Sequence, residues 1–387
     1  MHYSTDRILT SHVGSLPRPD DVLRRIYAHQ DEGVPFDDEY WDMVAKAVDE
    51  VVKQQKAAGI DIVSDGEIGK VGFTNYLSDR LEGLGGETVM WSFHDLAVVP
   101  EVAERQYQSE GGKRICMPAC VGELKYVGQE HVARDLANLR RALDAHGIDD
   151  AFMPAVSPGS VTFQIVNRHY PSYEDYVMAI AEAMREEYEA IAAAGFTLQL
   201  DATDIPISAP EHGIFWASDV VEEMGYQNFI ALNLEATNHA TASIPGEQMR
   251  LHLCWANYEG PHHFDVPLIE VLEPSLRICR AKTISFEAAN PRHAHEWTVF
   301  EDLKLPDDVV IMPGVIDTTT NFIEHPELVA QRIEQFARLV GRDRVIAGTD
   351  CGFGTFAGFG EVAPAAAWLK LASLGEAAGI ASRRLWS

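Results

Sequence analysis

The sequence predicts a parallel α/β fold, specifically a (β/α)8 TIM barrel, in a single domain of residues 1–387. Short apolar runs typical of strands alternate along the chain with stretches of helical periodicity, which is the pattern of a parallel sheet covered by helices. Polar residues gather where these strands end, as the catalytic face of a barrel requires. A doubly wound sheet is the alternative, but no Gly-x-Gly-x-x-Gly loop opens the first helix.

Nine segments have the apolar character of strands, one more than a barrel needs. They cover residues 8–14, 60–64, 114–121, 151–156, 197–200, 249–255, 283–286, 309–315 and 344–347. The segment 114–121 follows a stretch without clear period. We therefore assign it to an insertion near residues 84–125 that covers the mouth of the barrel.

Apolar residues at helical spacing fill the intervals between the strands. The clearest helix begins at Pro326 and continues through Val329 and Phe336 to a stop at Gly341. Proline at the first position and glycine after the last are typical helix ends. Similar apolar stripes end at Gly59, Gly147 and Gly195.

The composition argues against a nucleic-acid-binding or membrane protein. The chain has 31 Lys and Arg against 59 Asp and Glu, a formal charge of −28, and no basic stripe stands out. No segment approaches the about 18 uninterrupted apolar residues of a membrane helix, and the N-terminus has no apolar signal region, so we expect a cytoplasmic protein. Five cysteines without framework spacing favour reduced thiols over disulfides.

Two metal-binding side chains project from one predicted strand. In the run Gln248-Met-Arg-Leu-His-Leu-Cys-Trp255, apolar residues alternate with Arg250, His252 and Cys254. Alternate side chains of a strand lie on the same face, so His252 and Cys254 are neighbours there. Imidazole and thiolate make half of a zinc ligand set, although buried His and Cys are also common core residues.

Two further potential ligands follow other predicted strands. Glu287 comes directly after the segment 283–286, and Cys351 follows the segment 344–347. A barrel brings its strand ends around one mouth, so these two residues can meet His252 and Cys254 at one ion. Zinc fits this set best, with the carboxylate as a labile fourth ligand. Taken separately, Glu287 can cap a helix and Cys351 can pack in the core.

A set of short motifs occurs in order along nearly the whole chain. They are Ser11-His-Val-Gly-Ser-Leu-Pro-Arg18, Asp65-Gly-Glu67, Leu198-Gln-Leu-Asp201, Leu251-His-Leu-Cys254, Ile284-Ser-Phe-Glu287, Pro313-Gly-Val-Ile-Asp317 and Asp350-Cys-Gly352. Together they resemble the catalytic domain of cobalamin-independent methionine synthase. The stretches 254–263 and 348–356 resemble more closely a short single-domain branch, which includes epoxyalkane:coenzyme M transferase.

The resemblance implies a (β/α)8 barrel that holds zinc through the four ligands named above. In that family the metal binds the sulfur of a small thiol, such as homocysteine or coenzyme M, as a thiolate that attacks a methyl or alkyl donor. By the same resemblance, Ser15 binds the acidic end of the thiol substrate, and Glu67 and Asp201 bind its amine. The expected partners are therefore a small-molecule thiol and an alkyl donor.

The sequence departs from the family on the donor side. The tryptophan that stacks on folate falls near Val166, and the histidine proposed as proton donor falls at Thr318 or Thr319. An aromatic stacking surface and an acidic proton are thus missing at these positions, whereas all four metal ligands are present. The sequence predicts thiol activation with a donor other than the usual polyglutamyl folate.

The reaction itself requires an activated thiol and an acid. A thiol with a pKa near about 8.5 is mostly protonated at neutral pH, and coordination to a divalent cation deprotonates it. The leaving group then needs a proton. Candidate acids are His12, His212, His262 and His263. We select His12, with Glu67 and Asp201 as further catalytic groups and Trp255 as a wall of the substrate pocket.

Two other classes of protein stay open. A metal-free decarboxylase resembling uroporphyrinogen decarboxylase would share the barrel, but it does not explain two Cys and one His at strand ends. A non-catalytic protein that stores zinc or binds a thiol would share the ligands. The sequence specifies neither the thiol, nor the donor, nor the oligomeric state.

Overall fold

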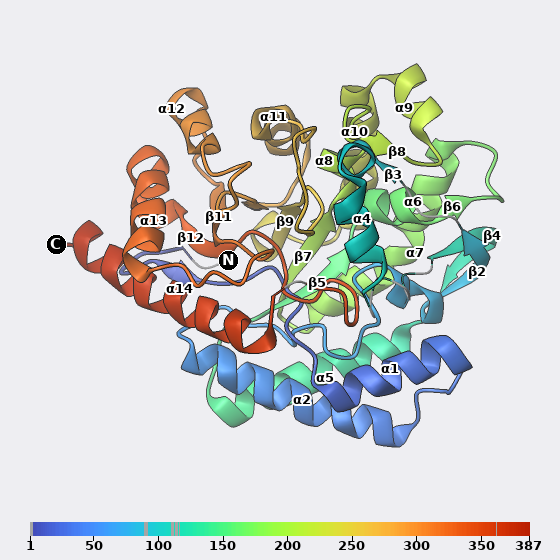
Figure 1. Cartoon of the computed structure of the whole chain (residues 1–387), viewed down its shortest axis with the longest axis horizontal. Helices are drawn as coiled ribbons and strands as arrows, with labels where there is room; N and C mark the ends of the chain where they lie inside the picture. The colour runs from blue at the N-terminus through green and yellow to red at the C-terminus, as the bar shows by residue number, and fades with distance from the viewer. Residues whose placement is uncertain (1–2, 89–91, 110–111, 113–114, 116, 361) are drawn as a thin grey trace.

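Seven parallel strands form one curled sheet in the computed structural model, which describes every residue except 1–2, 89–91, 110–111, 113–114, 116 and 361 (Figure 1). Their order is β1 (Leu9–Thr10), β12 (Ile346–Thr349), β11 (Val310–Ile316), β10 (Thr283–Phe286), β9 (Met249–Leu253), β7 (Thr197–Ala202) and β5 (Phe152–Val156). Every neighbouring pair is parallel. The predicted α/β class and the parallel sheet are confirmed.

Helices alternate with these strands and lie around the sheet (Figure 1). They are α1 (Asp20–Glu32), α2 (Asp38–Ala57), α5 (Gln129–His146), α6 (Pro158–Gln164), α7 (Tyr173–Ala193), α8 (Asp204–Ile207), α9 (Ser218–Met224), α10 (Tyr226–Ala240), α11 (Leu268–Ile278), α12 (Val299–Asp302), α13 (Pro326–Val340) and α14 (Pro364–Leu385). Helix α13 begins at Pro326 and buries Val329 and Phe336, as its spacing predicts. None of the helices in the described part of the chain is long and apolar enough to cross a membrane.

The predicted strand 60–64 makes two parallel bridges instead of a ladder. Ile62 pairs with Ser11, beside β1, and Val63 pairs with Ala151, beside β5. The Asp61 carboxylate accepts the N–H of Thr10. In a full β-ladder this N–H would be available to a backbone oxygen of the neighbouring strand. The sheet is therefore seven strands with one bridged segment between its edges, where the sequence predicts eight full strands.

A compact buried cluster joins residues from both edges of the sheet. Its members are Leu9, Val13, Ile62, Phe152, Cys254, Val310, Met312, Ile346 and Cys351. Arg250 on β9 places its guanidinium 3.8 Å from the centre of the Phe152 ring and donates to the backbone oxygen of His12. The two cysteines of the predicted metal site thus lie in an apolar environment.

The predicted insertion near residues 84–125 forms a separate layer beside the sheet (Figure 1). Strand β2 (Leu81–Thr88) pairs antiparallel with β4 (Met117–Tyr126), and β6 (Val166–Asn167) lies next to β4. Strand β3 (Ser92–Phe93) pairs with β8 (Gly213–Ile214), and the helices α3 (His94–Val98) and α4 (Pro100–Tyr107) follow β3. The predicted strand 114–121 becomes part of β4, outside the central sheet; its residues 114 and 116 lie outside the described part.

A buried ion network joins the insertion to helix α7. Arg80, which precedes β2, lies 3.1 Å from the Glu187 carboxylate of α7 and 2.6 Å from that of Asp135. Tyr76 and Tyr126 donate their hydroxyls to Glu187 at 2.8 and 2.6 Å. Arg80 therefore pairs with the fully buried Glu187 carboxylate and the partly buried Asp135 carboxylate.

We expect Arg80→Met to lower the free energy of unfolding by about 3–5 kcal/mol, because it leaves the Glu187 carboxylate buried without a cation. Urea denaturation measures the loss. Arg338→Met is the matched control: Arg338 pairs with Glu334, but its side chain is 69% exposed, so the loss stays below about 1 kcal/mol. Equal losses in the two variants would contradict this assignment.

Candidate active site

A cavity of about 100 Å³ lies at the carboxyl ends of the central strands. Ser15 after β1, Asp201 on β7, Cys254 after β9 and Cys351 after β12 all line it. Parallel strands end at the same edge of a sheet, which is why residues far apart in the sequence meet here. The insertion supplies another part of the wall through Phe93, Leu96, Gln106 and Ile115.

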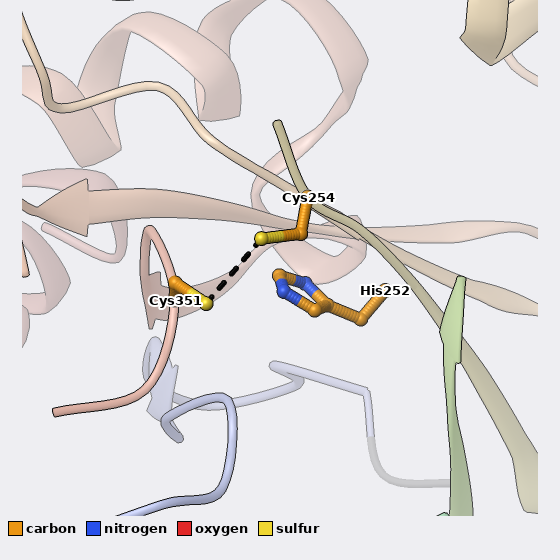
Figure 2. Close-up of side chains that lie close together, drawn as sticks. All are labelled: His252, Cys254 and Cys351. Carbon is orange, nitrogen blue, oxygen red and sulfur yellow. Dashed lines mark hydrogen bonds between the residues drawn. The ribbon is translucent and has the colours of Figure 1, made fainter. Parts of the chain in front are cut away.

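Three of the four predicted metal ligands converge at this cavity. The side chains of His252, Cys254 and Cys351 point toward one another (Figure 2). The two sulfurs are 3.5 Å apart, and one potential ligand atom from each residue lies within 4.8 Å of the other two. The neighbouring Cys351 thiol and burial raise the pKa of Cys254 well above its ordinary value. These surroundings disfavour the thiolate form of Cys254, and a cation bound to the group would favour it.

The His252 ring has the environment of a metal ligand. Its Nδ1 lies 3.3 Å from the Ser285 hydroxyl, whereas its Nε2 is buried and has no hydrogen-bond partner among the described residues. Burial, together with the charge of Arg250, lowers the pKa of His252 to about 3, so the ring is neutral. A neutral imidazole held through one nitrogen leaves the other for a metal, so the residues present fit such an ion.

The Glu287 carboxylate lies outside this three-residue group. Its Oε1 accepts the backbone N–H of Trp255 at 2.7 Å, and its Oε2 accepts the Asn290 amide at 2.8 Å. Asp350 holds the backbone that follows β10, accepting the N–H groups of Ala288 and Ala289 at 2.8 Å each. Local hydrogen bonds thus orient Glu287 along the rim formed by β9 and β10.

Glu67 belongs to a strained turn at the cavity. It has a φ of 55°, and Gly66 before it has a φ of 67°. The Asp65 carboxylate accepts the Glu67 N–H at 3.0 Å, and Arg18 donates to its backbone oxygen at 3.1 Å. A non-glycine residue in this conformation is costly and persists where surrounding contacts enforce it. The turn directs the Glu67 side chain to the cavity wall.

The Asp201 carboxyl is buried beside Glu67. Burial raises the pKa of Asp201 well above its ordinary value, and the Glu67 charge raises it further. Gln199 donates to its Oδ1 at 2.7 Å. Ser15 also lines the cavity, where the Gly354 N–H donates to its hydroxyl at 3.3 Å. The structure therefore brings together Ser15, Glu67 and Asp201, which the resemblance assigns to the thiol substrate.

His12 and Trp255 are not among the residues that line the cavity. His12 is buried: its Nε2 lies 2.7 Å from the Gln55 amide oxygen, and its Nδ1 accepts the Gly14 N–H at 3.2 Å. Burial lowers its pKa to about 3, which removes the proton that an acid would need. The Trp255 indole donates to the backbone oxygen of Val266 at 2.8 Å and packs in the core.

Aromatic residues form much of the wall. They are Phe356 and four residues that the sequence did not single out, Phe73, Phe93, Tyr258 and Phe359. Phe93 and Tyr258 stack with ring centres 5.6 Å apart. Val166, near which the resemblance places the folate-stacking residue, lies on β6 beside β4, whereas its neighbour Gln164 lines the cavity. The irregular segment that carries Phe93 offered no periodic signal.

This fold and cavity are those of an α/β enzyme, with a group of His and Cys side chains that could hold a metal ion. Residues 156–367, more than half of the chain, match the family model of the cobalamin-independent synthase catalytic domain. The chain therefore belongs to the cobalamin-independent methionine synthase family, a family of methyltransferases.

Individual relatives are distant but match over most of their length. A methionine synthase of Thermococcus kodakarensis is 23% identical over 348 residues, which cover 89% of this chain and 86% of the relative. A 2-hydroxypropyl-CoM lyase of Xanthobacter autotrophicus is 24% identical over 380 residues, 89% of each chain. The solved B12-independent methionine synthase of a Shewanella species, in complex with selenomethionine, has a TM-score of 0.70 at 20% identity and covers 98% of this chain and 99% of its own. The two proteins share a fold.

We expect Asp65→Asn to remove a pH-dependent cost of folding, because burial raises the pKa of Asp65 to about 6. The folded pKa lies above the unfolded one, so the stability from this group is present below about pH 4 and is lost as the pH rises through about 6. The asparagine keeps the oxygen that accepts the Glu67 N–H. Urea denaturation should show the variant gaining about 1 kcal/mol over the parent between about pH 5 and about pH 8. Exposed Asp144 on α5, changed to Asn, is the control; a flat difference for Asp65→Asn would contradict the assignment.

Proposed function

We propose that this protein is a zinc-dependent transferase that moves a methyl or alkyl group to the sulfur of a small thiol. The observation that carries the proposal is the convergence of His252, Cys254 and Cys351 at the cavity. Membership of the methionine synthase family supports methyl transfer to a thiol as the reaction class.

Zinc is the proposed metal because two thiolates and a neutral imidazole select a soft or borderline cation. The buried, unpartnered Nε2 of His252 supports a ligand there. In this proposal Glu287 is the fourth ligand, since its carboxylate is held at the adjoining end of β10 and can exchange for a substrate. The cation, when bound, supplies the positive charge that keeps a substrate thiol deprotonated.

Polar residues of the cavity wall bind the charged ends of the thiol substrate and protonate the leaving group. Glu67 receives an ammonium group, and Ser15 binds a carboxylate or another acidic end. Asp201 takes the role of proton donor that the sequence assigned to His12. Burial beside Glu67 keeps its carboxyl protonated, and a protonated carboxyl in a cavity can protonate a leaving group.

We also propose that the segment 60–64 acts as the eighth strand of the barrel. Its bridges at Ile62 and Val63 link β1 to β5. Residues 1–387 would then form one closed (β/α)8 domain with the cavity at its carboxyl face. The polar turn Asp65-Gly-Glu67 would end this strand as the other site residues end theirs.

The lining of the cavity favours a compact, weakly polar donor. Phe73, Phe93, Leu96 and Phe356 line it. The position of the folate-stacking Trp falls near Val166, and that of the proton-donating His falls at Thr318 or Thr319. A second candidate function is therefore opening of an epoxide by a zinc-bound thiol, as in the family branch of epoxyalkane:coenzyme M transferase. The similarity to 2-hydroxypropyl-CoM lyase supports it.

We expect about one thiolate-bound zinc per chain, and loss of most of it in Cys351→Ser. Removal of one sulfur from a group whose sulfurs are 3.5 Å apart breaks the ligand set. Elemental analysis after gel filtration measures the metal. Cys120→Ser, a buried thiol on β4, is the control and should keep the metal. Full zinc content in both Cys254→Ala and Cys351→Ala would refute the proposed site.

We expect the zinc-loaded protein to make little methionine from methyltetrahydrofolate and homocysteine, and to turn over compact donors faster, with an epoxide and coenzyme M as the first pair to assay. Asp201→Asn should lower that turnover by about 10²–10⁴-fold, because it removes the proposed proton donor while keeping zinc. Product analysis by mass spectrometry provides the measurement. Methionine formed at many turnovers per minute would overturn the prediction on the donor, and full activity of Asp201→Asn would overturn its catalytic role.

A further inference from the structure

A second group of buried carboxylates and imidazoles lies apart from the cavity lining. Its centre is Asp265, in the loop that follows β9. Its Oδ2 lies 2.9 Å from His262 Nδ1 and 3.0 Å from His293 Nε2, and its Oδ1 lies 3.2 Å from His212 Nδ1. His293, which the sequence analysis did not assign to a site, is only 2% exposed. One buried carboxylate thus faces three histidines from three parts of the chain.

A second carboxylate comes from the insertion. Asp95, on α3, is fully buried, and its Oδ1 lies 2.9 Å from His263 Nδ1 and 3.2 Å from the backbone N–H of Phe264. One potential ligand atom each from Asp95, His262 and Asp265 lies within 4.8 Å of the other two. Two carboxylates this close in a buried site repel each other unless positive charge lies beside them.

Two polar atoms of this group have no hydrogen-bond partner within the described ranges, Asp95 Oδ2 and His212 Nε2. His212 Nδ1 and Asp265 Oδ1 face each other at 3.2 Å without a well-aligned hydrogen bond. The His212 ring is completely buried and directs Nδ1 at Asp265. Unpartnered buried polar atoms are expensive, so their concentration around one point indicates a ligand.

We propose that Asp95, His262 and Asp265 form a second metal site, with His212 as a further imidazole ligand. The site would hold a divalent transition-metal cation that prefers nitrogen and oxygen ligands. Carboxylate and imidazole donors without sulfur select such ions, in contrast to the thiol-rich group at the cavity. The site belongs to the architecture around the cavity and does not depend on the proposed transferase reaction.

Outer contacts orient the ligands as metal sites require. The Nε2 of His262 lies 3.0 Å from the backbone oxygen of Tyr258, so Nδ1, which faces Asp265 Oδ2 at 2.9 Å, is the nitrogen that a cation between the two side chains would use. His293 bridges the Asp265 and Glu296 carboxylates at 3.0 and 2.8 Å, so it fixes the direction of Asp265. His262 also has a φ of 49°, a strained conformation that surrounding contacts must enforce.

The cation would join three segments that surround the cavity. Asp95 is next to Phe93 and Leu96 in the cavity wall; His212 precedes β8, which pairs with β3; and His262 follows the Tyr258 loop. Binding would hold the insertion against the loop that begins at Cys254. The metal would therefore have a structural role, since it would order the part of the cavity wall that carries Phe93 and Leu96.

Cobalt(II) titration of the chelator-treated full-length protein tests the proposal, because thiolate-to-cobalt charge-transfer absorption distinguishes the two sites. We expect two equivalents per chain, one with this absorption and one without it. Asp95→Asn and, separately, His262→Gln should weaken the equivalent without thiolate absorption at least about tenfold and keep the other. Cys351→Ser should have the reverse effect.

The control is Glu259→Gln, which changes an exposed carboxylate of the same loop that pairs with Arg105. It should keep both equivalents, and circular dichroism confirms that each variant is folded. A titration that ends at one thiolate-bound equivalent, or an Asp95→Asn protein that binds both as tightly as the parent, overturns the proposal. Protonated histidines alone would then neutralise Asp95 and Asp265. If the parent protein instead binds one equivalent without thiolate absorption, the result contradicts the proposed transferase site and supports the second site.

Discussion

The burial of two thiols and one imidazole at a common strand edge is the constraint on which the site depends. Cys254 and Cys351 belong to the apolar cluster that joins both edges of the sheet, and their sulfurs are 3.5 Å apart. In such surroundings a lone thiolate is costly, and the second thiol raises the pKa of the first. The same burial that stabilises the fold therefore disfavours a free thiolate here, which is why the proposed activation of this group requires a cation.

Strand register transmits this constraint to the neighbouring residues. His252 is in register with Asp201 on β7 and with Ser285 on β10, so three adjacent strands place these residues in one row. Ser285 can therefore hold Nδ1 of His252, and Asp201 reaches the cavity on the other side. A slip of one residue in β9 would turn His252 to the opposite face and separate it from both. The parallel ladder thus fixes the positions of His252 and Asp201 together.

Hydrogen bonds between loops hold the strand ends at these positions. The Asn257 amide donates to the backbone oxygen of Gly352 at 2.7 Å, which links the loop after β9 to the loop after β12. A Cβ on Gly352 would lie 2.0 Å from the Ser15 hydroxyl, so a side chain at this position would displace that hydroxyl. The loops that carry both sulfurs and the proposed anion-binding serine therefore form one connected rim.

The sequence predicted those parts of the site that follow from periodicity and strand ends, and missed those that depend on distant partners. Alternation in β9 placed His252 and Cys254 on one face because side-chain direction in a strand is a local property. The burial of His12 depends on Gln55 from α2, which no local pattern reveals. The direction of Glu287 depends on a backbone N–H at Trp255. The sequence predicted a full strand at residues 60–64, but the Asp61 side chain, instead of a backbone oxygen, accepts the N–H of Thr10.

Backbone strain marks the same region independently of the ligands. Within the described residues, positive φ angles outside glycine occur at Glu67, Ala256 and His262. Each costs about 1–3 kcal/mol, so each requires surrounding contacts that enforce it. Glu67 and Ala256 line the cavity, and His262 belongs to the second carboxylate–imidazole group behind it. A fold keeps strained residues where the direction of their side chains matters more than local stability. Glu67, the cavity wall at Ala256 and the second group at His262 are such places. The insertion contributes to the same region through Phe93 in the wall and Asp95 in the second group.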